Sequence, residues 1–181
     1  MTSPFFVRNA PAVRAATAGT SLFPSVVLAQ MALESGFGKS TLAARYGNYF
    51  GHKASARWQG RTVTLATPHD GQKQSAFRVY ASLADCLRAH VALLRQPLYR
   101  AAQLAATPYA QVAALAKTYA EDSAYQTKLA ALISSQNLTQ FDTAAPGPAP
   151  YLVLAALGAA AYHYRARLRV MAKQLLLTKR F

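Results

Sequence analysis

The sequence predicts a mainly α-helical fold of the α+β class, with one β-hairpin in its body and a separate helical tail. Two observations predict the body: apolar residues recur at helical spacing in several segments, and two short β-rich runs flank one turn signal. A proline-rich string after the body marks a linker. Apolar residues make up 52% of the 181 residues, so the chain can bury one sizeable core.

The first helix that the sequence defines begins at Pro24. Proline is favoured in the first turn of a helix, and Gly36 is suited to ending one in a left-handed conformation. The run between them contains almost nothing polar. Glu34 therefore lies in the last turn of an apolar helix.

A β-hairpin is expected next, because residues 61–65 and 76–80 alternate or are rich in β-forming residues. The pair Asp70 and Gly71 between them is a turn signal.

Three further helices follow, each with apolar residues at helical spacing. Ser82 is suited to capping the first of them, and Thr107 with Pro108 opens the second. The third carries Tyr125 on its apolar face.

The chain divides into a body at residues 1–144, a linker at 145–150 and a tail at 151–181. Prolines in the linker prevent a continuous helix. The tail starts with an apolar run shorter than the ~20 residues that a membrane-spanning helix needs, and continues as a basic amphipathic helix. We expect it to anchor the chain at an anionic membrane surface or bilayer; the alternative is a soluble helix packed on a partner subunit.

The formal net charge of +14 predicts an anionic partner, either nucleic acid, acidic lipid or cell-wall polymer. No nucleic-acid recognition motif accompanies the charge, so specific nucleic-acid binding is disfavoured. The histidines lack metal-ligand spacing and no phosphate-binding glycine loop is present, so we expect neither metal nor cofactor. Cys86, the single cysteine, is expected in the core, and the N-terminus does not resemble a secretory signal.

Glu34 is the leading candidate for chemistry. The negative end of the helix dipole and the apolar neighbours Leu33 and Phe37 both disfavour its anion, so its pKa should be raised. A carboxylic acid that stays protonated near neutral pH is what glycoside hydrolysis needs. The alternative from local sequence is a structural glutamate that pairs with Lys39 or Arg45.

Five segments in order along the chain show a resemblance to a known family. They are AQMALESGFGK (29–39), GNYFGHK (47–53), WQG (58–60), FRVY (77–80) and YAEDSAY (119–125). Together they resemble the bacterial endo-β-N-acetylglucosaminidase family, which includes autolysins and the wall-cutting domain of a flagellar rod protein. The resemblance covers roughly Pro4 to Phe141.

The resemblance implies a lysozyme-like fold and cleavage of β-1,4 bonds in peptidoglycan after N-acetylglucosamine. It implies that Glu34 is the general acid and that Tyr119 lies close to it. Aromatic side chains suit the apolar faces of sugar rings. The residues implied to bind substrate or shape the cleft are Asn48, Tyr49, Phe50, Asp122 and Tyr125.

The sequence departs from the family pattern at two places. Many relatives carry a glutamate on the hairpin, where this chain has ATPHDG at 66–71, so Asp70 becomes the candidate second carboxylate. Without it, the acetamido group of the substrate would have to stabilise the oxocarbenium ion. His52 stands where relatives usually have an aliphatic residue.

These expectations describe a peptidoglycan hydrolase tethered to a membrane and facing the cell wall, or carried by a virion or a secretion machine. The alternatives are a lytic transglycosylase or muramidase on the same scaffold, and a wall-binding assembly protein without hydrolytic activity.

Overall fold

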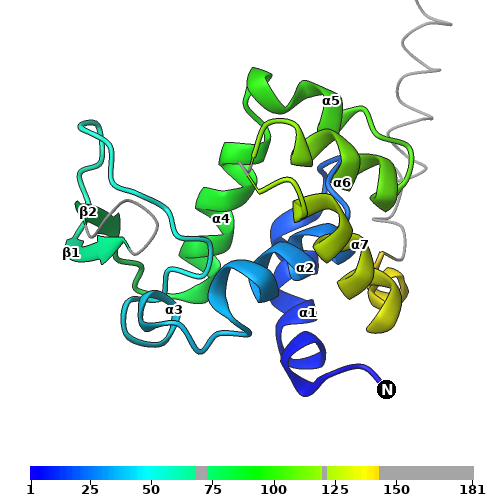
Figure 1. Cartoon of the computed structure of the whole chain (residues 1–181), viewed down its shortest axis with the longest axis horizontal. Helices are drawn as coiled ribbons and strands as arrows, with labels where there is room; N and C mark the ends of the chain where they lie inside the picture. Colours follow the sequence, from blue (N-terminus) through cyan, green and yellow to red (C-terminus); the bar gives the residue numbers. More distant parts are fainter. Residues whose placement is uncertain (68–72, 120–121, 143–181) are drawn as a thin grey trace, which may run out of the picture. The chain divides into compact units, whose positions relative to one another are not determined.

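The computed structural model describes residues 1–67, 73–119 and 122–142 (Figure 1). The chain divides into two units, Met1–Thr143 and Ala144–Phe181. The predicted tail and linker, and Asp70 on the hairpin, lie outside the described residues. Among the described residues, no helix is long and apolar enough to span a bilayer.

The helix α2 (Pro24–Ser35) lies at the centre of the first unit. It contacts α1 (Pro4–Thr17), α6 (Pro108–Ala116) and α7 (Tyr125–Ser135). The segment from Ser25 to Ala32 is buried along its whole length, as is typical of a helix that is apolar on all sides. A central helix surrounded in this way gives a rigid base to any group at its end.

The remaining helices complete the core. These are α4 (Leu83–Leu94), α5 (Arg100–Gln103) and two 3₁₀ turns, Pro97–Tyr99 and Leu138–Phe141. The turn at Leu138–Phe141 packs on α2, and the carboxylate of Asp142 after it accepts hydrogen bonds from the Ser25 amide (2.7 Å) and hydroxyl (2.6 Å). The first turn of α2, whose own N-cap Phe23 has no side-chain acceptor, is thus capped from the far end of the body.

The hairpin lies to one side of the helices, beside the short helix α3 (Thr41–Tyr46) (Figure 1). Its strands β1 (Thr62–Thr67) and β2 (Lys73–Arg78) are antiparallel, with Val63 opposite Phe77. The chain after β2 is tied to the end of α3, because the Tyr80 amide donates to the Tyr46 carbonyl (2.9 Å).

The expected class, mainly α with one hairpin, is confirmed. The helix from Pro24 to Gly36 is confirmed with Gly36 left-handed (φ 55°), and Ser82 and Thr107 cap their helices through their side chains. The hairpin is confirmed, but its strands run over 62–67 and 73–78 rather than 61–65 and 76–80. Cys86 is buried in the core, as expected.

Candidate active site

Glu34 lies in the last turn of α2, with its side chain open to solvent on one side. Burial of the carboxyl group against the protein raises its pKa above the ordinary value, and a hydrogen bond with the Tyr125 hydroxyl partly opposes that rise. The raised pKa agrees with the expectation from the sequence. The result is a carboxyl group that keeps its proton to a higher pH than an exposed glutamate does and still has a donor for its anion.

Two tyrosines accompany Glu34. Tyr125 begins α7, and its ring stacks on that of Tyr119 with centroids 5.7 Å apart. Burial, followed by the charge of Glu34, raises the pKa of both phenols. Both hydroxyls therefore stay protonated, and the fold brings Glu34 together with two tyrosines that lie far from it along the chain.

The Tyr125 hydroxyl has a second partner that sequence reasoning missed. The side-chain amide of Gln30, one turn before Glu34 on α2, donates to it over 3.0 Å. Gln30 is fully buried. A signal existed, because an amide in so apolar a run must find hydrogen-bond partners in the core.

The loop before the hairpin is held by Asn48. Its side-chain nitrogen donates to the carbonyl oxygens of His52 (3.0 Å) and Arg78 (2.9 Å), and its oxygen accepts from the His52 amide (2.9 Å). The side chain is 1% exposed. Asn48 therefore shapes the loop, and a direct contact with substrate stays a prediction.

The two aromatic residues after Asn48 face different surroundings. Phe50 is buried and stacks on the ring of His90, with centroids 3.6 Å apart and an interplanar angle of 4°. Tyr49 is half-buried and lines a separate pocket of about 370 Å³ with Arg8 and Lys39. The His90 ring in turn contacts the Tyr119 ring edge-on, with centroids 5.8 Å apart. Of the two aromatic residues, only Phe50 therefore belongs to the packing around Tyr119.

Asp122 precedes α7 on the surface. Its carboxylate accepts from the Ala124 amide (2.9 Å) and from the Lys128 ammonium (2.6 Å), and these hydrogen bonds lower its pKa. In this structure Asp122 organises the turn that leads into Tyr125. A role in binding substrate stays a prediction.

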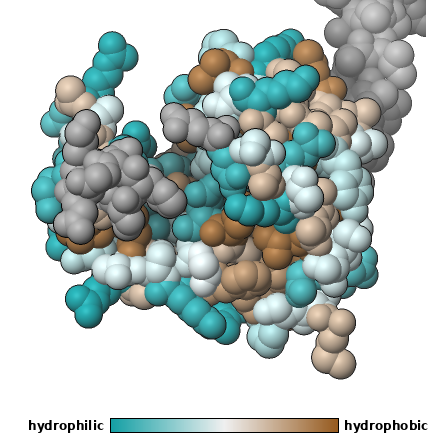
Figure 2. Space-filling view, in the orientation of Figure 1, coloured by the Kyte–Doolittle hydropathy of each residue, from teal (hydrophilic) through white to brown (hydrophobic). Residues whose placement is uncertain are grey.

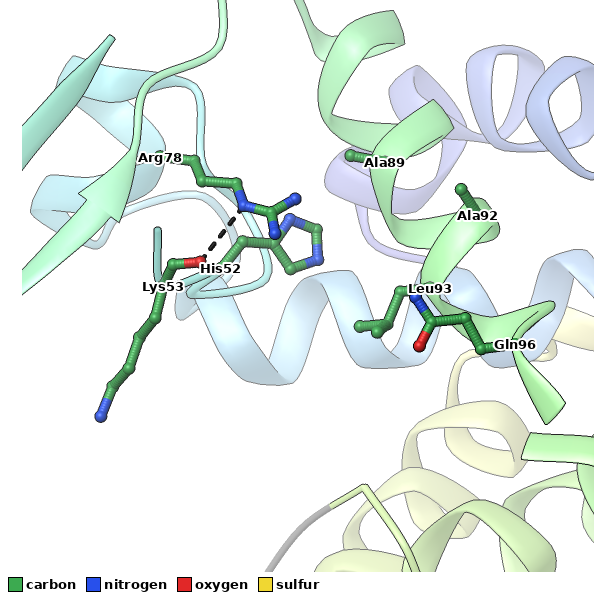
Figure 3. Close-up of a pocket in the computed structure, with 7 residues that line it drawn as sticks. All are labelled: His52, Lys53, Arg78, Ala89, Ala92, Leu93 and Gln96. Carbon is green, nitrogen blue, oxygen red and sulfur yellow. Dashed lines mark hydrogen bonds between the residues drawn. The ribbon is translucent and has the colours of Figure 1, made fainter. Parts of the chain in front are cut away.

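A pocket of about 330 Å³ opens between the hairpin side and α4. Figure 3 shows Arg78 and His52 projecting towards α4, across from Leu93 and Gln96. The Arg78 guanidinium is held in place, since its Nε donates to the Lys53 carbonyl (3.2 Å) and its Cζ lies 4.8 Å from the centroid of the Trp58 ring. In the space-filling view the surface is hollowed between the hairpin side and the helices, and hydrophilic residues border the hollow (Figure 2).

Comparison with known proteins gives this arrangement a context. Residues 10–138 match the model of the glucosaminidase family, described as mannosyl-glycoprotein endo-beta-N-acetylglucosaminidase. The catalytic domain of the autolysin Auto from Listeria monocytogenes has a similar structure, with a TM-score of 0.69 and 33% identity over 78% of this chain and 90% of that one.

Two curated relatives are similar in sequence. The peptidoglycan hydrolase FlgJ of Salmonella typhimurium is 36% identical over 140 residues, which are 71% of this chain and 44% of FlgJ. A probable N-acetylmuramidase of Lactococcus lactis is 35% identical over 157 residues, 79% of this chain and 35% of that protein. The chain thus spans less than half the length of each of these relatives.

Proposed function

The chain belongs to the glucosaminidase family, and from that premise we propose that it hydrolyses peptidoglycan at the β-1,4 bond after N-acetylglucosamine, with Glu34 as the general acid. The observation that carries the proposal is the setting of Glu34, a solvent-accessible carboxyl group whose pKa is raised by burial and which meets the Tyr125 hydroxyl. The names of the similar proteins, an autolysin and a peptidoglycan hydrolase, support the choice of polymer.

In the proposed reaction, protonated Glu34 gives its proton to the glycosidic oxygen as the bond to the leaving sugar breaks. The carboxylate that remains is stabilised by the hydrogen bond from Tyr125. Tyr119, kept neutral beside Glu34, can donate a hydrogen bond to the sugar. The partner of Glu34 is either Asp70, which lies outside the described residues, or the acetamido group of the substrate.

The basic pocket between the hairpin side and α4 suits an anionic polymer. Peptidoglycan carries carboxylates on its peptide stems, and Arg78 presents a fixed guanidinium to the pocket. We assign this pocket to the stem peptide, with the sugar chain lying over Glu34.

The test of the reaction is digestion of purified peptidoglycan followed by mass spectrometry of the reduced products. Products that end in reduced N-acetylglucosamine are expected. The Glu34→Gln protein, with an unchanged circular dichroism spectrum, should release none; release by that variant at the wild-type rate would overturn the assignment.

A second specificity is favoured by one observation, the similarity to a probable N-acetylmuramidase. A muramidase would leave reduced N-acetylmuramic acid at the ends, and a lytic transglycosylase would leave anhydro-muramic ends. The same mass spectra separate these outcomes from glucosaminidase cleavage.

We further propose that the tail holds the enzyme at an anionic membrane surface, with the catalytic body facing the cell wall, or that a virion or secretion machine carries it there. Support comes from the sequence of 151–181, which is apolar and then basic. The full chain should float with vesicles that contain acidic lipid. Replacing Arg165, Arg169 and Lys173 by glutamate should abolish flotation; flotation of that variant would refute the proposal.

A further inference from the structure

A line of buried polar side chains leads from the end of the hairpin to α2. The Tyr80 hydroxyl lies 2.8 Å from His52 Nδ1, and His52 Nε2 lies 3.3 Å from His90 Nδ1. His90 Nε2 then lies 3.1 Å from the side-chain oxygen of Gln30. None of the four is more than 8% exposed.

This line continues to the candidate acid. The Gln30 amide nitrogen donates to the Tyr125 hydroxyl (3.0 Å), and that hydroxyl is hydrogen-bonded to Glu34. Glu34 thus interacts with Tyr125, which a series of hydrogen bonds joins to the hairpin side. We refer to Gln30, His90, His52 and Tyr80 as the relay.

The direction of every hydrogen bond in the relay follows from the chemistry of imidazole. Burial lowers the pKa of His52 to about 4 and that of His90 well below its ordinary value, so both rings are neutral and each has one donor and one acceptor nitrogen. Gln30 uses its nitrogen on Tyr125, so its oxygen must accept from His90 Nε2.

The other protons are then fixed in turn. His90 Nδ1 must accept from His52 Nε2, and His52 Nδ1 must accept from the Tyr80 hydroxyl. In each of these hydrogen bonds, the donor lies on the hairpin side and the acceptor on the α2 side. Because the Tyr125 oxygen already accepts from Gln30, its own proton is directed at Glu34.

We propose that the relay is a positioning device that holds Tyr125 as a hydrogen-bond donor to Glu34, so that the acidic proton of Glu34 remains available to the substrate. If the relay ran in the opposite direction, the Gln30 oxygen would take the Tyr125 proton. Glu34 would then donate its own proton to Tyr125, which is an unproductive arrangement for an acid. The inference rests on the proposed role of Glu34.

The surroundings keep the relay dry and neutral. Phe50 stacks on His90, and Tyr119 contacts the same ring edge-on. The charged and titratable groups facing the relay are Arg78, whose charge disfavours a second proton on His52, and Cys86, whose pKa burial raises to about 11. Tyr119 and Tyr99 face the Glu34 end.

The first test needs no variant and no substrate. Nitrogen-15 NMR of the imidazole rings in the full chain should show His52 and His90 both as Nε2–H tautomers at pH 7. An Nδ1–H tautomer at either ring would overturn the relay direction.

The second test follows the titration of Glu34. The chain has only two glutamates, Glu34 and Glu121, so carbon-13 labelling of glutamate gives two side-chain carboxyl signals, and Glu34→Gln assigns them. In Gln30→Met the Tyr125 oxygen loses its donor and becomes free to accept from Glu34. The midpoint of the Glu34 signal should therefore rise by about one pH unit, the size of one hydrogen bond to a carboxylate.

Gln111→Met is the matched control. Gln111 is also a fully buried amide, but it bonds to the backbone of Phe23, Ser21 and Ala102. This change should lower stability and leave the midpoint of Glu34 where it is in the wild type. An unshifted Glu34 in Gln30→Met, or an equal shift in the control, would refute the inference. Activity of Glu34→Gln would instead refute the proposed function, since neither NMR measurement depends on turnover.

Discussion

Removal of one hydroxyl, in Tyr125→Phe, probes the site most directly. Tyr125 is 3% exposed, and its hydroxyl serves both Gln30 and Glu34. The change leaves the Gln30 amide N–H without an acceptor in the core, which costs about 1–3 kcal/mol. For a domain of this size that corresponds to a fall in Tm of roughly 3–9 °C.

The effect on catalysis has a defined sign. The hydrogen bond from Tyr125 lowers the pKa of Glu34, so its loss must raise that pKa further. A general acid works while it is protonated, so the alkaline limb of the kcat profile should move to higher pH. The carboxylate left after proton transfer also loses its donor, and kcat on the plateau should fall about tenfold.

The assay is release of reducing ends from purified peptidoglycan at closely spaced pH values, at a temperature well below the Tm of the variant. Tyr109→Phe provides the control, because it removes a phenol hydroxyl from a side chain that is 46% exposed. An alkaline limb that stays in place, or moves to lower pH, in Tyr125→Phe would show that Tyr125 does not donate to Glu34.

Three further outcomes are expected. The pKa of Glu34 in the folded state lies above the unfolded value of 4.5, so the contribution of Glu34 to stability is complete below pH 4.5 and is lost as the pH rises. Calorimetry should therefore give Glu34→Gln a higher Tm than the wild type at pH 8 and an equal Tm at pH 4. The pKa of His52 is depressed to about 4, so the stability of the wild type should fall as pH drops from about 6.5 towards 4. The midpoint of urea unfolding should fall less over this range in His52→Ile than in the wild type. Arg78→Gln should raise KM for intact peptidoglycan roughly tenfold with kcat unchanged, and should leave KM for peptide-stripped glycan unaltered; equal effects on both substrates would remove the stem-peptide assignment.

The parts of the fold that the sequence predicts are those with local signals. Pro24 and Gly36 mark the two ends of α2, and Ser82 marks the start of α4. The helix α1 was not predicted, since Pro11 lies inside it and the segment carries no acidic residue in its first turn. The strand ends were displaced because side-chain alternation alone does not fix a pairing register.

In the site, too, the residues that were predicted are those with signals in the local sequence. Motifs along the chain point to Glu34, Tyr119 and Tyr125, and the fold brings these together. The relay could not be predicted, because His52 and His90 are 38 residues apart and no spacing rule links them. Their contact depends on how the loop held by Asn48 packs against α4, which is decided only in the folded core.

The cap on α2 affects the order in which parts of the chain can fold. The first turn of the helix that holds Glu34 depends on the carboxylate of Asp142, and the N-terminal residues Thr2 and Ser3 are hydrogen-bonded to Gln136. A chain emerging from a ribosome or a translocation channel cannot make these bonds until residue 142 is free. The first turn of α2 can therefore take its capped form only after the chain up to residue 142 has been released.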